Sequence, residues 1–189
     1  YLMSGKFVVQ IRFDQLRVDL SSLKSLLRLG VPSGVQNSLI SIANLVVQTN
    51  INAFGDQAMA GCGSYSKLEG FVFLPIVSLT LALTTFVGQN LGARQPDRCK
   101  QGARIGILLA VLMAELFGLL YWLFAPTLIG LFSDSPDVIA FGVRQARTEA
   151  LFYFLLAFAH AAAAVLRGAG KTVTPMVVMI LCWCMLRIT

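Results

Sequence analysis

The stretch FVGQNLGARQPDRCKQGAR, Phe86 to Arg104, lies between two long apolar runs. It is interrupted by glycines and carries four cations, whereas the run on each side has the length of a membrane-crossing helix. Apolar helical runs joined by short basic segments are typical of proteins that cross the membrane several times, with the basic segments on the cytoplasmic side. We therefore expect this stretch to be a cytoplasmic loop between two spans.

The composition supports a membrane protein. Hydrophobic residues make up 57% of the 189 residues and charged residues only 13%, with a mean hydropathy of +0.75. Soluble domains carry about 25% charged residues, so a soluble chain of this size could not bury the apolar excess. The net charge of +6 comes from basic residues that gather between apolar runs, which argues against nucleic acid as a partner and for the lipid bilayer.

The predicted fold is an all-α polytopic membrane helix bundle. Residues 1–29 form a cytoplasmic or interfacial approach segment, and residues 30–189 form a transmembrane part. The five expected spans cover about residues 30–54, 67–91, 105–131, 150–166 and 175–186. Glycine-rich residues 55–66 are expected to be a loop, Pro32 to lie at a helix start, and residues 137–149 to be an exposed helical entry to the fourth span.

The distribution of Lys and Arg predicts the orientation of the chain in a cell membrane. Eleven of these residues lie in the N-terminal segment, the segment 92–104 and the turn 167–171, against four on the other side. Cytoplasmic loops carry the excess of positive charge. The N-terminal segment and the 92–104 loop are therefore expected in the cytoplasm.

The first span has an unusually polar interior. Gln36, Asn37, Asn44 and Gln48 are spaced by about seven and four residues, which predicts that they share one side of a helix turned away from lipid. Such amides can line a substrate-binding cavity, or they can hydrogen-bond to neighbouring helices. Both readings stay open.

Three carboxylates are candidates for a protonatable or cation-binding group. Glu115 interrupts the third apolar run, where an exposed charge costs about 2.5–3.5 kcal/mol, so it should face protein or water. Glu69 and Glu149 lie near span starts, where the alternative is that they reach the interface by snorkelling.

No motif for enzyme chemistry is complete in this sequence. Gly170-Lys171-Thr172 ends like a phosphate-binding loop, but Val165 stands where the first glycine is needed. His160 has no Ser or Cys partner at motif spacing, which favours a packing role. The cysteines form no metal-ligand pattern. We therefore predict a protein that is not an enzyme and that uses no metal or cofactor.

Five strings in order resemble the multidrug and toxic compound extrusion (MATE) family of antiporters. They are Gly30-Val-Pro-Ser-Gly-Val-Gln36, Asn50-Ile-Asn-Ala-Phe-Gly55, Ser66-Lys-Leu-Glu69, Thr84-Thr-Phe-Val-Gly-Gln-Asn-Leu-Gly-Ala93 and Leu166-Arg-Gly-Ala-Gly170. The chain resembles spans seven to eleven of twelve, so that about five helices of the six-helix C-terminal lobe are present.

The resemblance implies export of small cationic amphiphilic drugs in exchange for H⁺ or Na⁺, by alternating access between two lobes. The missing N-terminal lobe of the same transporter would supply the other cavity wall. Some family members carry coupling carboxylates in the first and fourth spans of this lobe, whereas the corresponding stretches here offer Ile40 and Leu156. Ion coupling could therefore rest on the other lobe.

Three other functions remain open. A lipid-linked polysaccharide flippase of the same superfamily would need deep basic residues, which the spans lack. A membrane subunit without transport activity would gain nothing from a polar first span or from Glu115. An integral-membrane enzyme would need catalytic groups, and no such motif is present.

Overall fold

The structure, a computed structural model, describes residues 19–182, and this part of the chain is built from six helices. They are α1 (Leu20–Asn52), α2 (Asp56–Gly92), α3 (Pro96–Gly130), α4 (Pro136–Ala150), α5 (Tyr153–Gly168) and α6 (Val173–Ile180). The prediction of an all-α membrane helix bundle is confirmed. Residues 1–18, and residues 183–186 of the expected fifth span, lie outside the described part.

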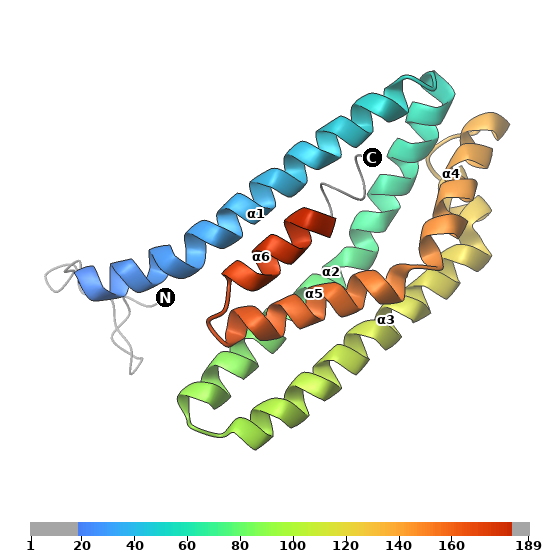
Figure 1. Ribbon diagram of the computed structural model, residues 1–189. Coiled ribbons are helices and arrows are strands. Elements are labelled where there is room, and N and C mark those ends of the chain that lie inside the picture. Colours follow the sequence, from blue (N-terminus) through green and yellow to red (C-terminus); the bar gives the residue numbers. More distant parts are fainter. Residues whose placement is uncertain (1–18, 183–189) are drawn as a thin grey trace, which may run out of the picture.

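Successive long helices run in opposite directions, so the connections alternate between the two ends of the bundle (Figure 1). The start of α1, the α2–α3 turn and the α5–α6 turn lie at one end, and the α1–α2 and α3–α4 connections lie at the other. In the α2–α3 turn, Arg94 adopts a left-handed backbone (φ 56°), whereas Gly92 still belongs to α2. The described part of the basic N-terminal segment, the 92–104 segment and the 167–171 turn therefore share one end of the molecule.

Helices α2 and α3 are each long and apolar enough to cross a membrane. Helices α4 and α5 reach that standard only as a pair, bent by 56° at Leu151 and Phe152. Helix α1 has 33 residues, about 50 Å, but its polar side chains keep its hydropathy lower. The first span therefore differs in character from the second and third.

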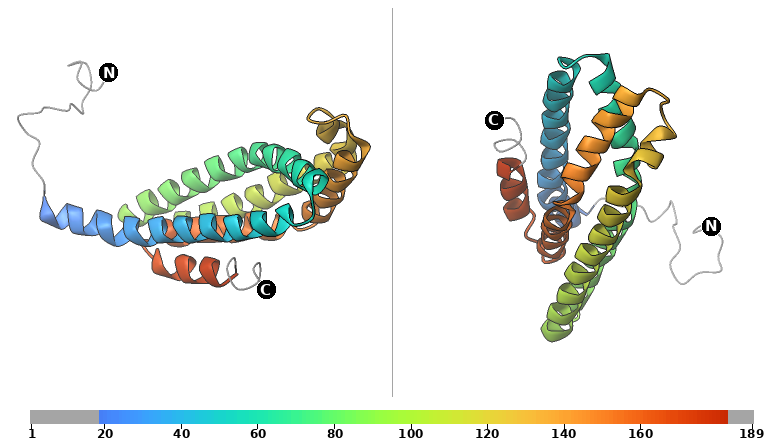
Figure 2. Two further views of the ribbon diagram at one scale, coloured as in Figure 1. Left: turned by 90° about the horizontal axis from the view of Figure 1, so that it is seen from above. Right: turned by 90° about the vertical axis from the view of Figure 1, so that its right-hand side faces the viewer.

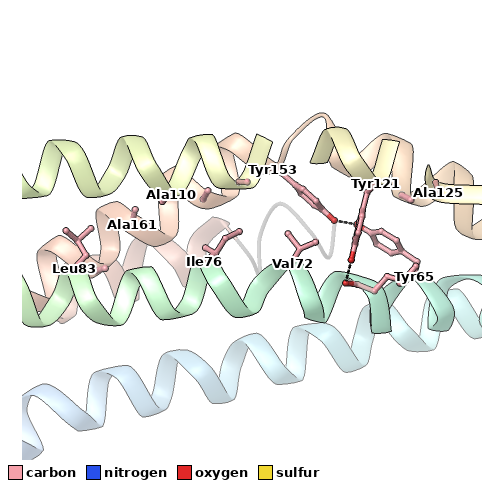
Figure 3. Packing of buried hydrophobic residues seen from close by; sticks show 14 of the residues in the cluster. Tyr65, Val72, Ile76, Leu83, Ala110, Tyr121, Ala125, Tyr153 and Ala161 are labelled. Carbon is pink, nitrogen blue, oxygen red and sulfur yellow. Dashed lines mark hydrogen bonds between the residues drawn. The ribbon is translucent and has the colours of Figure 1, made fainter. Parts of the chain in front are cut away.

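Small residues bring α2, α3, α4 and α5 close together. The buried face of α3 carries Gly106, Ala110, Ala114 and Gly118, each four residues after the last. Helix α5 presents a similar row of alanines to the same core. Small side chains let helix backbones approach, which is how membrane helices gain packing energy. Figure 3 shows Ala110 of α3 and Ala161 of α5 near the aliphatic residues Val72, Ile76 and Leu83 of α2.

The expected loop at residues 55–66 is wrong. Only Gly55, with φ 93°, belongs to a turn, and α2 begins directly at Asp56. A methyl group on Gly61 would lie 2.6 Å from the Val138 carbonyl oxygen and 3.1 Å from the Gly142 nitrogen. Gly61 is thus a contact between α2 and α4, and tertiary packing compensates for its low helix propensity.

Two other boundaries also need correction. Residues 137–149 are not an exposed entry, because α4 buries Val138, Gly142 and Ala146 within the bundle. The expected helix start at Pro32 is wrong as well, because α1 begins at Leu20 and continues through this proline. Membrane helices tolerate proline where their surroundings satisfy the freed backbone group. The second half of the approach segment and the first span therefore form one helix.

Candidate functional site

Polar and titratable side chains from four helices meet at one end of the core, opposite the basic turns. We call them the tyrosine–carboxylate cluster: Tyr65 and Glu69 of α2, Tyr121 of α3, Gln145 and Glu149 of α4, and Tyr153 of α5. Tyr65 and Tyr153 are 0% and 3% exposed. Figure 3 shows the three tyrosines together at the end of the aliphatic row. The cluster lies where α4 and α5 join.

A chain of hydrogen bonds runs through the cluster to Glu149. The Tyr65 hydroxyl donates to Glu149 Oε2 at 3.1 Å and lies 2.7 Å from the Tyr153 hydroxyl. A phenol has a single proton to donate. When Tyr65 donates to the carboxylate, Tyr153 must therefore donate to Tyr65, so both hydroxyl groups point their protons toward Glu149.

Gln145 completes the surroundings of this carboxylate. Its Nε2 donates to Glu149 Oε1 at 2.9 Å, one helical turn away on α4. Its Oε1 is buried and has no hydrogen-bond partner within the described residues. A buried polar atom without a partner costs free energy and calls for a physical explanation. An unused acceptor next to a carboxylate is suited to a bound proton or a small cation.

Glu69 lies close enough to the three tyrosines to act on them electrostatically. The Tyr121 hydroxyl donates to the Leu68 carbonyl oxygen, which ties α3 to the turn of α2 that carries Glu69. The structure thus brings Glu69 and Glu149 to one place.

The cluster spans the bend between α4 and α5. Glu149 lies in the last turn of α4, whereas Tyr153 is the first residue of α5. Tyr65 contacts both across the break. Any change in the charge of Glu149 would therefore act directly at the 56° bend.

The first-span amides do not all share one side. Asn37, Asn44 and Gln48 lie within about 40° of one another on the α1 helical wheel, whereas Gln36 is turned away by about 100°. Gln36 is 3% exposed on the buried face, while the other three are exposed. Gln48 Nε2 donates to Asn52 Oδ1 at 3.0 Å.

We call Asn37, Asn44 and Gln48 the α1 polar stripe. It is separate from the apolar row on the same helix, formed by Val31, Val35, Ile42 and Val46, which is also exposed. One exposed face of α1 thus suits lipid and another suits water or polar ligands.

Glu115 lies apart from the other two carboxylates. It is exposed on α3 and is surrounded by Leu112, Leu116 and Leu119, whose side chains are 56–57% exposed. Within the described chain it is thus not turned toward the core. His160, by contrast, packs edge-on against Phe73 at 6.1 Å between ring centroids, as a packing role predicts.

Tyr65, Tyr153 and Gln145 were not identified from the sequence. The spacing of Gln145, Glu149 and Tyr153 by four residues could have suggested a shared helix face. Tyr65 lies 84 residues from Glu149, and no sequence pattern connects them.

Comparison with known proteins gives consistent matches. The MatE family model matches residues 32–189. Probable multidrug resistance protein YoeA of Bacillus subtilis (strain 168) is 30% identical over 95% of this chain and 40% of that protein. Probable multidrug resistance protein NorM of Thermotoga maritima is 28% identical over 94% of this chain and 38% of that protein. The chain thus spans about 40% of the length of these relatives.

The same fold occurs in solved structures. An outward-facing multidrug resistance MATE family transporter of the MOP superfamily matches with a TM-score of 0.85. The match covers 95% of this chain and 41% of that one, at 23% identity. At this identity the likeness establishes the fold alone.

Proposed function

The chain belongs to the MatE family, and from this premise we propose that it forms most of one lobe of a secondary active multidrug antiporter. The transporter exports small cationic amphiphiles in exchange for H⁺ or Na⁺ by alternating access. It moves its substrate without catalysing a reaction. The basic end of the bundle faces the cytoplasm, in accordance with the grouping of Lys and Arg.

The observation that carries ion coupling is Glu149, a half-buried carboxylate that two donors hold at one end of the helix bundle. A carboxylate on a membrane helix that is paired and turned toward the bundle interior is a functional group by default. Tyr65 and Gln145 both donate to Glu149. The Gln145 Oε1 atom has no partner among the described residues. If the side-chain amide of Gln145 flips, this oxygen can accept a hydrogen bond from a protonated Glu149 or bind a Na⁺ ion.

Loading of Glu149 then acts on the α4–α5 bend. A bound proton or Na⁺ neutralises the charge of Glu149, which orders the hydrogen bonds between Tyr153, Tyr65 and Glu149. These hydrogen bonds join α4 to α5 through Tyr65. A coupling ion that alters the relative stability of two bends shifts the population of two transporter states. This links ion binding to a movement of the lobe.

The α1 polar stripe supports a substrate-facing role. Its amide oxygens can accept hydrogen bonds from ammonium groups, and its amides can hydrogen-bond to water in a cavity. Apolar side chains can do neither. The missing N-terminal lobe lies across this stripe and forms the opposite wall of the cavity. Cationic amphiphiles then bind between the two lobes.

The test uses the full-length transporter that contains this chain, purified and reconstituted into vesicles. Ethidium is loaded and its export is followed while a gradient of H⁺ or Na⁺ is imposed. Glu149→Gln is expected to reduce ion-driven export, whereas Glu149→Asp retains the ionisable group and part of the activity. Export by Glu149→Gln at the wild-type rate, from equal amounts of folded protein, would contradict the role of Glu149.

The same vesicles separate the proposal from its rivals. A transporter that exports ethidium without any other protein is not a passive subunit. A protein that leaves ethidium in place but moves a fluorescent lipid-linked oligosaccharide across the bilayer is a flippase instead.

A further inference from the structure

An apolar groove lies between α2 and α3 on the outside of the bundle. Phe71 of α2 forms one wall, and Phe117, Leu120, Phe124 and Leu128 of α3 form the other. Phe71, Leu120 and Phe124 are 66%, 39% and 52% exposed, so the groove opens outward from the core. It adjoins the tyrosine–carboxylate cluster, because Tyr121 belongs to the cluster and also lines the groove.

The groove faces away from the α1 polar stripe. In Figure 1, α3 lies along the opposite edge of the bundle from α1, and the left view of Figure 2 shows α2 on the side away from α6. Both helices that form the groove are long and apolar enough to span the membrane. The surface around it therefore meets the hydrocarbon interior of the bilayer.

A cation lies at one end of the groove. Lys67 is exposed one turn before Phe71 on α2, and its Nζ lies 5.6 Å from the centroid of the Phe132 ring, in the turn that follows α3. Residues 70–92 of α2 carry no charged side chain, and this uncharged length of about 35 Å begins three residues after Lys67. This length matches a hydrocarbon thickness of about 30 Å, so Lys67 lies at the headgroup level.

We infer that this groove binds one acyl chain of an anionic phospholipid whose phosphate pairs with the Lys67 ammonium group. The groove encloses about 290 Å³, the lower end of the ~300–1,000 Å³ range of small-molecule pockets. A narrow aliphatic chain fits such a groove better than a bulky drug does. The apolar walls take the chain, and the single cation at the membrane surface selects the charge of the headgroup.

The experiment uses the full-length transporter in phosphatidylcholine vesicles with a trace of phosphatidylglycerol that carries a diazirine in its acyl chain. After irradiation, the labelled peptides are identified by mass spectrometry. Unlabelled phosphatidylglycerol or phosphatidylcholine is added as competitor. Labelling is expected at Phe71 and Phe124, and phosphatidylglycerol should compete about fivefold better, the ratio that one interfacial cation supplies.

Two variants separate charge from shape. Lys67→Gln should make the two competitors equal, with labelling still in the groove. Arg147→Gln is the matched control, because Arg147 is also an exposed cation on an aromatic ring, that of Trp122, outside the groove. It should leave the preference unchanged.

Three results would overturn the inference. Labelling spread evenly over the exposed leucines Leu108 and Leu112 would mean that the groove holds no lipid preferentially. Absence of label from the groove would mean that another part of the transporter covers it. An undiminished phosphatidylglycerol preference in Lys67→Gln would remove the lysine from the site.

Discussion

Gly61 of α2 and Gly142 of α4 lie backbone against backbone where the two helices cross. A methyl group on Gly142 would lie 3.0 Å from the Gly61 carbonyl oxygen, and one on Gly61 would lie 3.1 Å from the Gly142 nitrogen. The crossing brings Glu149, two turns further along α4, to Tyr65 on α2. The position of the cluster therefore depends on the absence of two side chains.

Gly61→Ala should destabilise the bundle. The added methyl group would meet the Val138 carbonyl oxygen at 2.6 Å, and that oxygen belongs to the α4 backbone, so α4 must move. Overpacking of this kind costs about 1–3 kcal/mol. A fall in the thermal unfolding temperature in detergent measures it.

Gly63→Ala is the matched control for this change. A methyl group there has open space around it, on the same helix two residues away. Alanine is favoured over glycine in a helix by about 0.5–1 kcal/mol, so this variant should equal or exceed the wild type in stability. Equal losses in the two variants would contradict the close crossing.

Tyr65→Phe should cost more stability than Tyr153→Phe. Tyr65 contacts both Glu149 and Tyr153, whereas Tyr153 reaches Glu149 only through Tyr65. Loss of a buried donor to a carboxylate costs about 1–3 kcal/mol. The double variant should lose less than the sum of the single losses, because the two hydroxyls belong to one chain. Strictly additive losses in thermal unfolding would show that the two groups act independently.

Asn37→Leu on the α1 polar stripe should weaken substrate binding. Loss of one hydrogen-bonding group costs about 0.5–1.5 kcal/mol, which corresponds to an increase of about two- to tenfold in the dissociation constant for ethidium. Fluorescence anisotropy of ethidium with the full-length transporter measures this. Ile42→Leu, on the exposed apolar row of the same helix, should leave the affinity unchanged, and a similar loss there would remove the stripe from the cavity.

Glu115→Gln should reduce ethidium export less than Glu149→Gln does. Glu115 is exposed among leucines, whereas two donors hold Glu149 in the cluster. We therefore propose Glu149, and not Glu115, for the coupling role. An uncharged amide costs less than a charge at a lipid-facing position. Ion-driven ethidium export by both variants, at matched protein levels, decides between the two carboxylates, and a larger loss in Glu115→Gln would reverse the assignment.

The start of α1 should lose order in acid. The side chain of Asp19 caps the helix by accepting from Ser22 and Ser21, and these hydrogen bonds hold the pKa of its carboxyl group well below the ordinary value. The folded pKa is lowered, so the stabilisation is present above the unfolded value of about 3.9 and is lost as the pH falls toward the folded value.

Amide hydrogen exchange of residues 21–24 measures this loss. Asp19→Ala should give fast exchange at neutral pH as well, because the cap is absent at every pH. Protection that does not change in Asp19→Ala would show that the cap contributes nothing to the start of α1.

The sequence determined the class of the protein, the order of its main helices and the grouping of its basic segments. These features depend on the local density of apolar and charged residues, which determines which segments enter a membrane and in which orientation. The resemblance to MATE transporters rests on short strings for the same reason. The predicted loop at residues 55–66 was wrong because a glycine in a turn and a glycine at a helix crossing look the same in a sequence.

Only the tertiary structure decided which polar groups work together. The sequence singled out Glu69 and Glu149 as isolated carboxylates near span starts, and it grouped Gln36 with amides that point elsewhere. Partners 84 residues apart, such as Tyr65 and Glu149, meet because glycines and alanines on four helices allow close contact. That contact is a property of the packed bundle and of no single segment.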